Sequence, residues 1–379
     1  MTPPRVPTPA PSVPKPSGQG RLGQWLGGAA GLVVLGLALW ALSHIAGDTS
    51  WSQVRASIHD TPTLMLLLAA GCAAASYVVL IAYDWLAVRH LKYVVPLKTV
   101  ALASFTSFTM SHTLGLTVLT GGTVRYRIYT RAGVKPLDVA LIVLLCGWTF
   151  WLGIIAVAGL GLVISPDLAT PFRHVATMAI RWFTGDRTAA TYGDFALVVE
   201  RWAGVLLLAA TAAYTLLATL YRKPIRWKAI DFTLPDGRET LLQIVVGAVD
   251  LAFAALVIYV LLPVEGRPGV LSFFVIYAVA MVVGALSHSP GGLGVFELVI
   301  VKLLPESPKP EVLAALVLFR LIYTLIPFLI GLVMLGATEF AAFRQRRREL
   351  PAPAAAPPEP AIAAQGPTSS PIPSAPSRP

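Results

Sequence analysis

The sequence predicts an all-α polytopic membrane protein with about eight membrane segments, six of them full spans and two of them re-entrant broken helices. Three observations lead to this fold class. The composition is 56% hydrophobic and only 13% charged, whereas soluble domains carry about 25% charged residues. Apolar runs of about 20 residues, enough to cross the hydrocarbon core, recur along the chain. Two of these runs are interrupted by polar and glycine-rich stretches.

Eight runs are long enough to enter the membrane. Six contain no charged residue: Leu22–Gly47, Thr61–Tyr83, Thr99–Val124, Val139–Pro166, Trp202–Tyr221 and Pro268–Phe296. Two more contain one charge each, namely Thr240–Val264 with Asp250 and Val312–Thr338 with Arg320. The membrane domain is therefore expected to cover residues 23–340, in two halves of about 23–166 and 200–340.

Both ends of the chain are of low complexity. Residues 1–22 form a Pro-rich tail, and residues 341–379 are first basic and then rich in Pro and Ala. Neither tail has enough apolar residues to form a core, so both are expected to be disordered and cytoplasmic. The loop Asp167–Arg201 carries four Arg and four acidic residues. No segment is expected to hold a soluble catalytic domain.

The net charge of +10 does not indicate nucleic-acid binding, because the basic residues lie in short loops and at the ends of the chain. Membrane proteins retain such residues on the cytoplasmic side. Cys72 and Cys146 lie inside apolar runs and imply no disulfide framework. No Walker loop, Ser-His-Asp spacing or Cys/His cluster is present. We therefore expect no cofactor, no metal and no ATPase or hydrolase activity.

Charged loops also predict a re-entrant segment. Arg125, Arg127, Arg131 and Lys135 should lie on the cytoplasmic side, yet a simple span over Thr99–Val124 would place them outside. The conflict disappears if that run enters and leaves through the cytoplasmic face. Eight of the twelve residues from 104 to 115 are Ser, Thr, His or Gly. That composition suits a segment facing a cavity.

A second broken segment lies at the corresponding place in the second half. There the helix-breaking sequence Ser287-His288-Ser289-Pro290-Gly291 follows an uncharged run. In the first half the counterpart is Ser111-His112-Thr113-Leu114-Gly115. With the first half starting inside and the second outside, the pattern predicts an inverted-topology repeat with both termini cytoplasmic. The alternative for the second segment is a surface loop between two spans.

Two longer motifs carry a resemblance to a known family. They are Leu119-Thr120-Gly121-Gly122-Thr123-Val124-Arg125-Tyr126-Arg127-Ile128-Tyr129 and the stretch from Ser287 to Glu297. With them, Asp250 and the stretch from Arg320 to Tyr323 make the chain resemble the membrane domain of the bacterial lysylphosphatidylglycerol synthase/flippase family. The resemblance covers roughly Trp25–Phe340 and implies lipid handling in the inner membrane. The sequence ends shortly after the last span, so the synthase activity is not expected here, and the lipid is left open.

Charges inside the apolar runs are candidate functional residues, because each costs about 2.5–3.5 kcal/mol to insert at the centre of a helix. Arg320 and Glu297 are expected to pair, with Asp250 as a competing acid. The pair is either a gate or head-group contact, or a static lock between helices. Asp84, next to Trp85, is interpreted as a residue of the membrane interface.

Glycines, arginines and histidines complete the candidate binding site. Gly121, Gly122, Gly291 and Gly292 either expose backbone amides to phosphate oxygens or allow close helix packing. Arg125 and Arg127 either bind lipid phosphate in bidentate fashion or only anchor the cytoplasmic side. His112 and His288 make an incomplete metal set, so we expect hydrogen bonding in a cavity, with a proton relay as the alternative.

The function that these features indicate is a phospholipid flippase or lipid transporter, whose partner is a membrane phospholipid. A first alternative is a membrane-embedded lipid-modifying enzyme or a partner subunit of a lipid synthase, using Asp250, Glu297 and the histidines as acid–base groups. A second is a scaffold whose Pro-rich tails recruit a soluble partner. No enzymatic activity is expected under the first hypothesis.

Overall fold

The computed structural model describes residues 36, 50–115, 117–164, 193–221, 225–227, 230–287 and 289–349. The predicted run Leu22–Gly47 (apart from Gly36), most of the loop Asp167–Arg201 and both tails beyond Glu349 and before residue 36 lie outside the described residues. The chain divides into two compact units, Met1–Ala337 and Thr338–Pro379. The contacts described below belong to the first unit, and α13 continues from it into the second.

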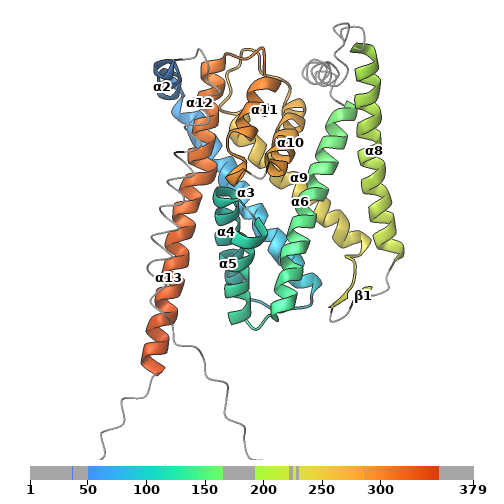
Figure 1. Ribbon diagram of the computed structural model, residues 1–379, viewed down its shortest axis with the longest axis vertical. Coiled ribbons are helices and arrows are strands. Elements are labelled where there is room, and N and C mark those ends of the chain that lie inside the picture. Colours follow the sequence, from blue (N-terminus) through green and yellow to red (C-terminus); the bar gives the residue numbers. More distant parts are fainter. Residues whose placement is uncertain are drawn as a thin grey trace, which may run out of the picture. The chain divides into compact units, whose positions relative to one another are not determined.

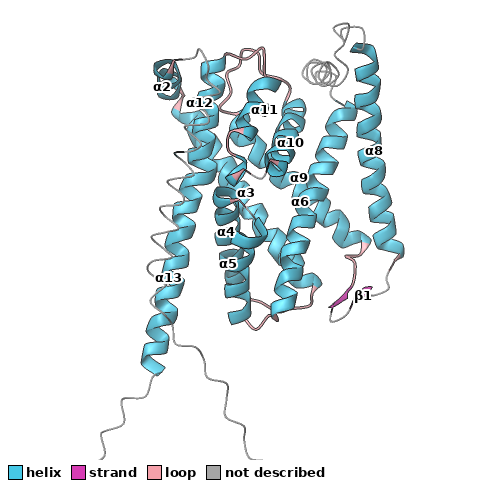
Figure 2. Ribbon diagram, in the orientation of Figure 1, coloured by secondary structure: helices cyan, strands magenta, loops and turns pink. Residues whose placement is uncertain are grey.

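Almost all described residues are helical (Figure 2). The helices are α2 (Trp51–Asp60), α3 (Thr63–His90), α4 (Leu97–Leu114), α5 (Thr117–Arg131), α6 (Pro136–Ile164), α8 (Gly193–Leu220), α9 (Gly237–Tyr259), α10 (Val270–Leu286), η3 (Pro290–Gly292), α11 (Val295–Leu303), α12 (Lys309–Phe319), η4 (Arg320–Leu325) and α13 (Ile326–Glu349). A short antiparallel pair, β1 (Ile225–Trp227) and β2 (Ile230–Phe232), precedes α9. The all-α membrane fold is therefore confirmed, with this small hairpin as an addition that the sequence pattern did not predict.

Five helices are long and apolar enough to cross a membrane. They are Thr63–His90, Pro136–Ile164, Glu200–Leu220, Gly237–Tyr259 and Lys309–Ala341. These match five of the six predicted full spans. The sixth, Leu22–Gly47, lies outside the described residues, so the total of eight segments stays a prediction.

The first broken segment is a helical hairpin formed by α4 and α5, which pack against each other along their lengths (Figure 1). The turn begins at Gly115, whose φ of 70° is readily available only to glycine. The chain enters and leaves on the same side, since the Tyr93 hydroxyl, before α4, donates to Asp138 Oδ2, after α5, at 2.5 Å. That hydrogen bond to a carboxylate raises the pKa of the Tyr93 phenol. The re-entrant geometry predicted for Thr99–Val124 is thus present, with α4 continuing to Leu114.

The second broken segment is a hairpin formed by α10 and α11. Between them, η3 and the following residues form a tight turn in which Gly291, Gly292 and Gly294 have φ values of 61°, 68° and 79°. The ends of this hairpin are also tied together, because the Ser307 hydroxyl, after α11, donates to the carbonyl oxygen of Gly266, before α10, at 2.8 Å. This segment is therefore a hairpin whose two ends lie together, the geometry expected of a re-entrant segment.

The two hairpins enter from opposite ends of the bundle. His90, the last residue of α3, contacts Glu239 in the first turn of α9 at 2.7 Å, so α3 and α9 run antiparallel as they pack together. The first hairpin starts where α3 ends, and the second starts where α9 ends. Their tips meet, because a Cβ atom at Gly291 would lie 3.0 Å from the carbonyl oxygens of both His112 and Thr113. This is the inverted arrangement that the sequence predicts.

Close backbone packing holds α6 against α9. Gly153 on α6 and Gly247 on α9 face each other, and a Cβ at Gly247 would lie 2.5 Å from the carbonyl oxygen of Thr149 and 2.9 Å from the Cα of Gly153. Such close approach of small residues is a typical source of helix association in membranes, where apolar burial supplies little driving force. The contact fixes α9, and with it Asp250, next to α6.

Candidate functional site

The first component of the site is an ion pair between the partly buried Arg320 and the buried Glu297, which closes the tip of the second hairpin. Arg320 Nε donates to Glu297 Oε1 at 2.7 Å, and Arg320 Nη1 donates to the carbonyl oxygen of Gly291 at 3.1 Å. The other carboxylate oxygen of Glu297 accepts from the backbone amide of Gly294 at 2.8 Å. The predicted pairing of Arg320 with Glu297 is thus confirmed. The pair fastens the glycine turn to the start of η4.

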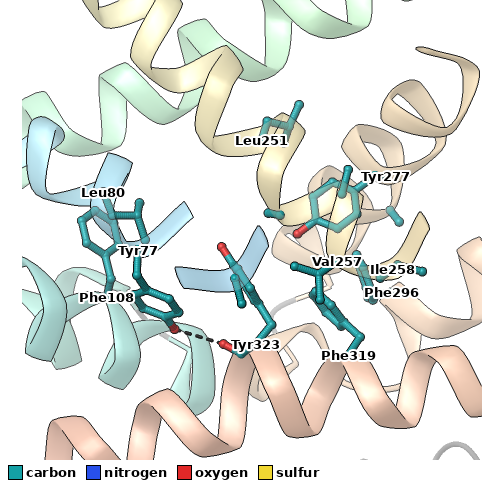
Figure 3. Close-up of a cluster of buried hydrophobic side chains, with 14 of the residues drawn as sticks. Tyr77, Leu80, Phe108, Leu251, Val257, Ile258, Tyr277, Phe296, Phe319 and Tyr323 are labelled. Atoms are coloured by element: carbon teal, nitrogen blue, oxygen red, sulfur yellow. Dashed lines mark hydrogen bonds between the residues drawn. The ribbon is translucent and has the colours of Figure 1, made fainter. Parts of the chain in front are cut away.

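The residues from Arg320 to Leu325 form a π-helix between α12 and α13. The Ile326 amide donates to the carbonyl oxygen of Leu321, five residues earlier. Pro327 has no amide hydrogen, so the carbonyl oxygen of Tyr323 lacks its usual donor four residues later. The Tyr77 hydroxyl replaces that donor at 3.1 Å (Figure 3). π-Bulges of this kind occur frequently at functional sites.

The bond from Tyr77 to the π-helix can be tested by substitution. Tyr77→Phe should lower the free energy of unfolding by about 1–3 kcal/mol, because it leaves a buried carbonyl oxygen without a donor. Adding Pro327→Ala restores a backbone amide near that carbonyl and should recover part of the loss. Thermal unfolding of the purified protein in detergent measures both effects. Tyr126→Phe, at an exposed tyrosine, is the control. Equal losses for Tyr77→Phe and Tyr126→Phe would contradict the assignment.

A stack of aromatic rings connects the two hairpins through this segment. His112 at the tip of the first hairpin stacks on Tyr323 with a centroid distance of 5.6 Å. Tyr323 stacks on Phe319 at 5.2 Å, and Phe319 stacks on Phe296 of α11 at 5.7 Å. Figure 3 shows Tyr323, Phe319 and Phe296 in this order. A structural change at either tip would therefore reach η4 through this series of contacting rings.

Four polar atoms near the end of α4 have no hydrogen-bond partner among the described residues. They are the hydroxyl oxygens of Ser107, Ser111 and Thr113 and the Nδ1 atom of His112. All three hydroxyl-bearing residues are buried. Buried polar groups are normally hydrogen-bonded, because leaving one unsatisfied costs about 1–3 kcal/mol. A polar ligand group that reaches the hairpin tip would satisfy these atoms.

A second buried ion pair lies within the first half of the bundle. Arg125 binds Asp84 in bidentate fashion, with Nε donating to Oδ1 at 2.9 Å and Nη2 donating to Oδ2 at 2.7 Å. The Tyr129 hydroxyl also donates to Asp84, and the guanidinium carbon of Arg125 lies 4.5 Å from the centre of the Phe108 ring. Arg125 is 1% exposed and Asp84 is 0% exposed.

These contacts bear on two expectations. Asp84, expected at the membrane interface, lies inside α3, which continues to His90, and its side chain is buried in the protein core against Arg125. The guanidinium of Arg125 is held by Asp84 and is closed to a lipid phosphate in this conformation. The predicted role of Arg125 as a phosphate ligand is therefore at odds with this geometry, whereas its role in fixing α5 against α3 is evident.

Arg127 and the glycine pair take different positions on α5. Arg127 is exposed and lies at the wall of a cavity of about 310 Å³, together with Thr120, Thr123 and apolar side chains from α4, α5 and Leu335 of α13. Gly121 lies inside α5, where a Cβ would collide with Ser111 Oγ on α4. Gly122 is in ordinary contact with Val143 of α6. Both glycines are thus in the body of a helix, not at its start, and the close-packing alternative fits Gly121.

The remaining predicted residues fall into three places. Gly291 and Gly292 form the tip of the second hairpin, and Gly291 contributes its carbonyl oxygen to Arg320. His288 lies outside the described residues. Asp250, in the middle of α9, is 6% exposed and accepts hydrogen bonds from Ser76 Oγ at 2.6 Å and from the Tyr83 hydroxyl at 3.0 Å. Asp250 does not compete for Arg320.

Fold and site together define the class of protein: a multi-pass helical membrane protein in which two re-entrant hairpins, entering from opposite ends, meet around a buried polar centre. Residues 28–331 match the family described as the lysylphosphatidylglycerol synthase TM region. The chain belongs to this family, as its motifs at residues 119–129 and 287–297 predict.

Two curated relatives align with nearly the whole membrane domain. The chain is 31% identical over 327 residues to the uncharacterized protein slr0712 of Synechocystis, an alignment that covers 85% of this chain and 94% of the relative. It is 28% identical over 311 residues to the inner membrane protein YbhN of Escherichia coli, covering 80% of this chain and 89% of the relative.

Proposed function

We propose that the protein is a lipid transporter of the flippase type, which moves a phospholipid head group through the polar centre between the two hairpin tips. The single observation that carries the proposal is the meeting of two oppositely oriented hairpins at buried polar atoms of α4 that have no hydrogen-bond partner in the described part of the chain. Broken helices that meet at the middle of an inverted repeat are the usual location of substrate sites in secondary transporters.

The surrounding contacts suggest how the site is used. The lipid tails would stay in the membrane while the head group reaches Ser107, Ser111 and Thr113. Arg127 lies on the wall of the cavity beside α5, where its charge suits a lipid phosphate. Arg320 would meet the phosphate only after release from Glu297, so their pair is assigned as a gate.

The proposal also includes the membrane in which the protein lies, its energy source and a candidate soluble partner. One relative is named an inner membrane protein, and the basic loops favour a bacterial inner membrane with both termini cytoplasmic. The sequence has no nucleotide-binding loop, so the energy for transport must come from an ion gradient or from mass action. The Pro-rich tails are candidate binding sites for a soluble partner.

The test is the leaflet distribution of fluorescent or amine-bearing phospholipids in proteoliposomes. Wild-type protein should accelerate movement between leaflets over protein-free vesicles, for at least one head group and without chemical change of the lipid. No acceleration for any head group would overturn the proposal. A chemically altered lipid in the same samples would instead support the alternative of a membrane-embedded lipid-modifying enzyme.

A further inference from the structure

Among the described residues, three carboxylates are buried, and they differ in how they are neutralised. Asp84 faces Arg125, and Glu297 faces Arg320, each with a nitrogen–oxygen distance of 2.7 Å. Asp250 has no basic side chain within ion-pair distance in the described part of the chain, and its two oxygens accept hydrogen bonds only from the hydroxyls of Ser76 and Tyr83. Asp250 is thus set apart from the other two acids.

The surroundings of Asp250 favour a neutral acid over an isolated charge. The titratable groups facing it are phenols: Tyr77 and Tyr83 on α3, Tyr277 on α10 and Tyr323 on η4, with the Cys146 thiol of α6 next to Tyr83. All of these side chains are ordinarily uncharged at neutral pH. Arg320, three residues before Tyr323, is already paired with Glu297. An ionised carboxylate without a cation is costly in such an interior, so it gains by taking up a proton.

We propose that Asp250 is the proton-binding site that couples lipid movement to the proton gradient. The inference rests on the proposed transport function and names its coupling ion. In one state Asp250 is a carboxylate held by two hydroxyl donors. In the other it has taken up one proton from water on one side of the membrane, and it releases that proton to water on the other side. No electrons are transferred and no other bond is broken.

Two hydroxyl groups, those of Ser76 and Tyr323, connect the Asp250 carboxyl to η4, which begins with Arg320 of the proposed gate. The hydroxyl of Ser76 has a single hydrogen, which it gives to the carboxylate. Since Ser76 Oγ also lies 2.9 Å from the Tyr323 hydroxyl, Tyr323 must be the donor in that bond. When Asp250 carries a proton, its own O–H needs an acceptor, and Ser76 Oγ lies 2.6 Å away. The Ser76 hydroxyl then donates to the Tyr323 hydroxyl. Both hydrogen bonds of Ser76 thus reverse their direction.

The reversal acts at η4, the segment that contacts both hairpin tips. Tyr323 belongs to η4, and its backbone carbonyl oxygen accepts a hydrogen bond from the Tyr77 hydroxyl. Its ring stacks on His112 at the tip of the first hairpin, and η4 begins with Arg320, which holds the tip of the second. A change in the bonding of one hydroxyl therefore reaches both tips without a long pathway.

Proton binding can be measured without any transport. Infrared spectra of the protein in lipid, recorded as a function of pH between about 5 and 9, should show a carboxylic-acid C=O band that disappears at high pH. Asp250→Asn should remove this band, whereas the control Glu306→Gln, at an exposed loop residue, should leave it unchanged. Absence of a band in wild-type protein, or its persistence in Asp250→Asn, would overturn the proposal. Size-exclusion profiles verify that each variant is folded.

Coupling is measured in the proteoliposome assay with a pH gradient imposed across the membrane. Wild-type protein should move lipid at least several-fold faster in one direction of the gradient, and Glu306→Gln should do the same. Asp250→Asn, which resembles the protonated acid and cannot release a proton, should lose this dependence on the gradient. If wild-type protein moves lipid with no response to the gradient, the coupling proposal fails and the transport proposal stands. If no lipid moves while the infrared band titrates, the transport proposal fails and the proton site stands.

Discussion

Replacing Arg125 with methionine should lower the free energy of unfolding by about 3–5 kcal/mol, the cost expected when one partner of a buried ion pair is removed. The substitution leaves the carboxylate of Asp84, which is 0% exposed, without its two guanidinium bonds. The hydrogen bond from Tyr129 remains and offsets only part of the loss. Thermal and chemical unfolding in detergent measure the effect.

Two further variants decide whether the loss comes from an unpaired charge. Arg127→Met removes an exposed arginine from the same helix and should change the free energy of unfolding by less than about 0.5 kcal/mol. The double variant Asp84→Leu/Arg125→Met replaces the ion pair by apolar contacts and should recover most of the stability, as replaced buried pairs often do. If Arg125→Met is no worse than Arg127→Met, the pair has no structural role.

Neutralising Glu297 should abolish lipid translocation. In Glu297→Gln the carboxylate that joins Arg320 to the amide of Gly294 is lost, so the turn of the second hairpin keeps only the bond from Arg320 to the Gly291 carbonyl as its link to η4. Arg320 is left as a buried charge without its acid. The leaflet assay should show a rate equal to that of protein-free vesicles, and Arg320→Ala should give the same result.

A double variant with neutral side chains at both positions distinguishes a gate from a static lock between helices. Glu297→Gln/Arg320→Gln removes both charges while keeping side chains that can hydrogen-bond, so it should be more stable than either single variant. If the charges act as a gate that meets the lipid phosphate, the double variant is folded and inactive. Translocation at the wild-type rate by this double variant would show that the pair only locks the helices.

The membrane fold could be predicted from the sequence because each part leaves a local signal. Long apolar runs indicate the spans, and the conflict between Arg125 to Lys135 and a simple span indicates the first re-entrant hairpin. Arg320 and Glu297 could be paired because few charges occur in the apolar runs, and an isolated one is costly. These arguments need only composition and order along the chain.

The contacts that were missed join segments that are distant in the sequence. Asp84 and Arg125 are 41 residues apart, and nothing local shows that α3 continues past the apolar run to bury Asp84. The network of Ser76, Tyr83 and Tyr323 around Asp250 likewise joins three helices. One signal was readable: a proline four residues after Tyr323 indicates a carbonyl that requires another donor.

The tethers at the base of each hairpin have a mechanical consequence. The bond from Tyr93 to Asp138 joins the two ends of one hairpin, and the bond from Ser307 to Gly266 joins the two ends of the other. Their tips leave no slack, since even a Cβ at Gly291 would press on two carbonyl oxygens. One tip can advance only if the other retreats. Under the proposed transport function, such a linkage would favour opening of the centre to one side of the membrane at a time.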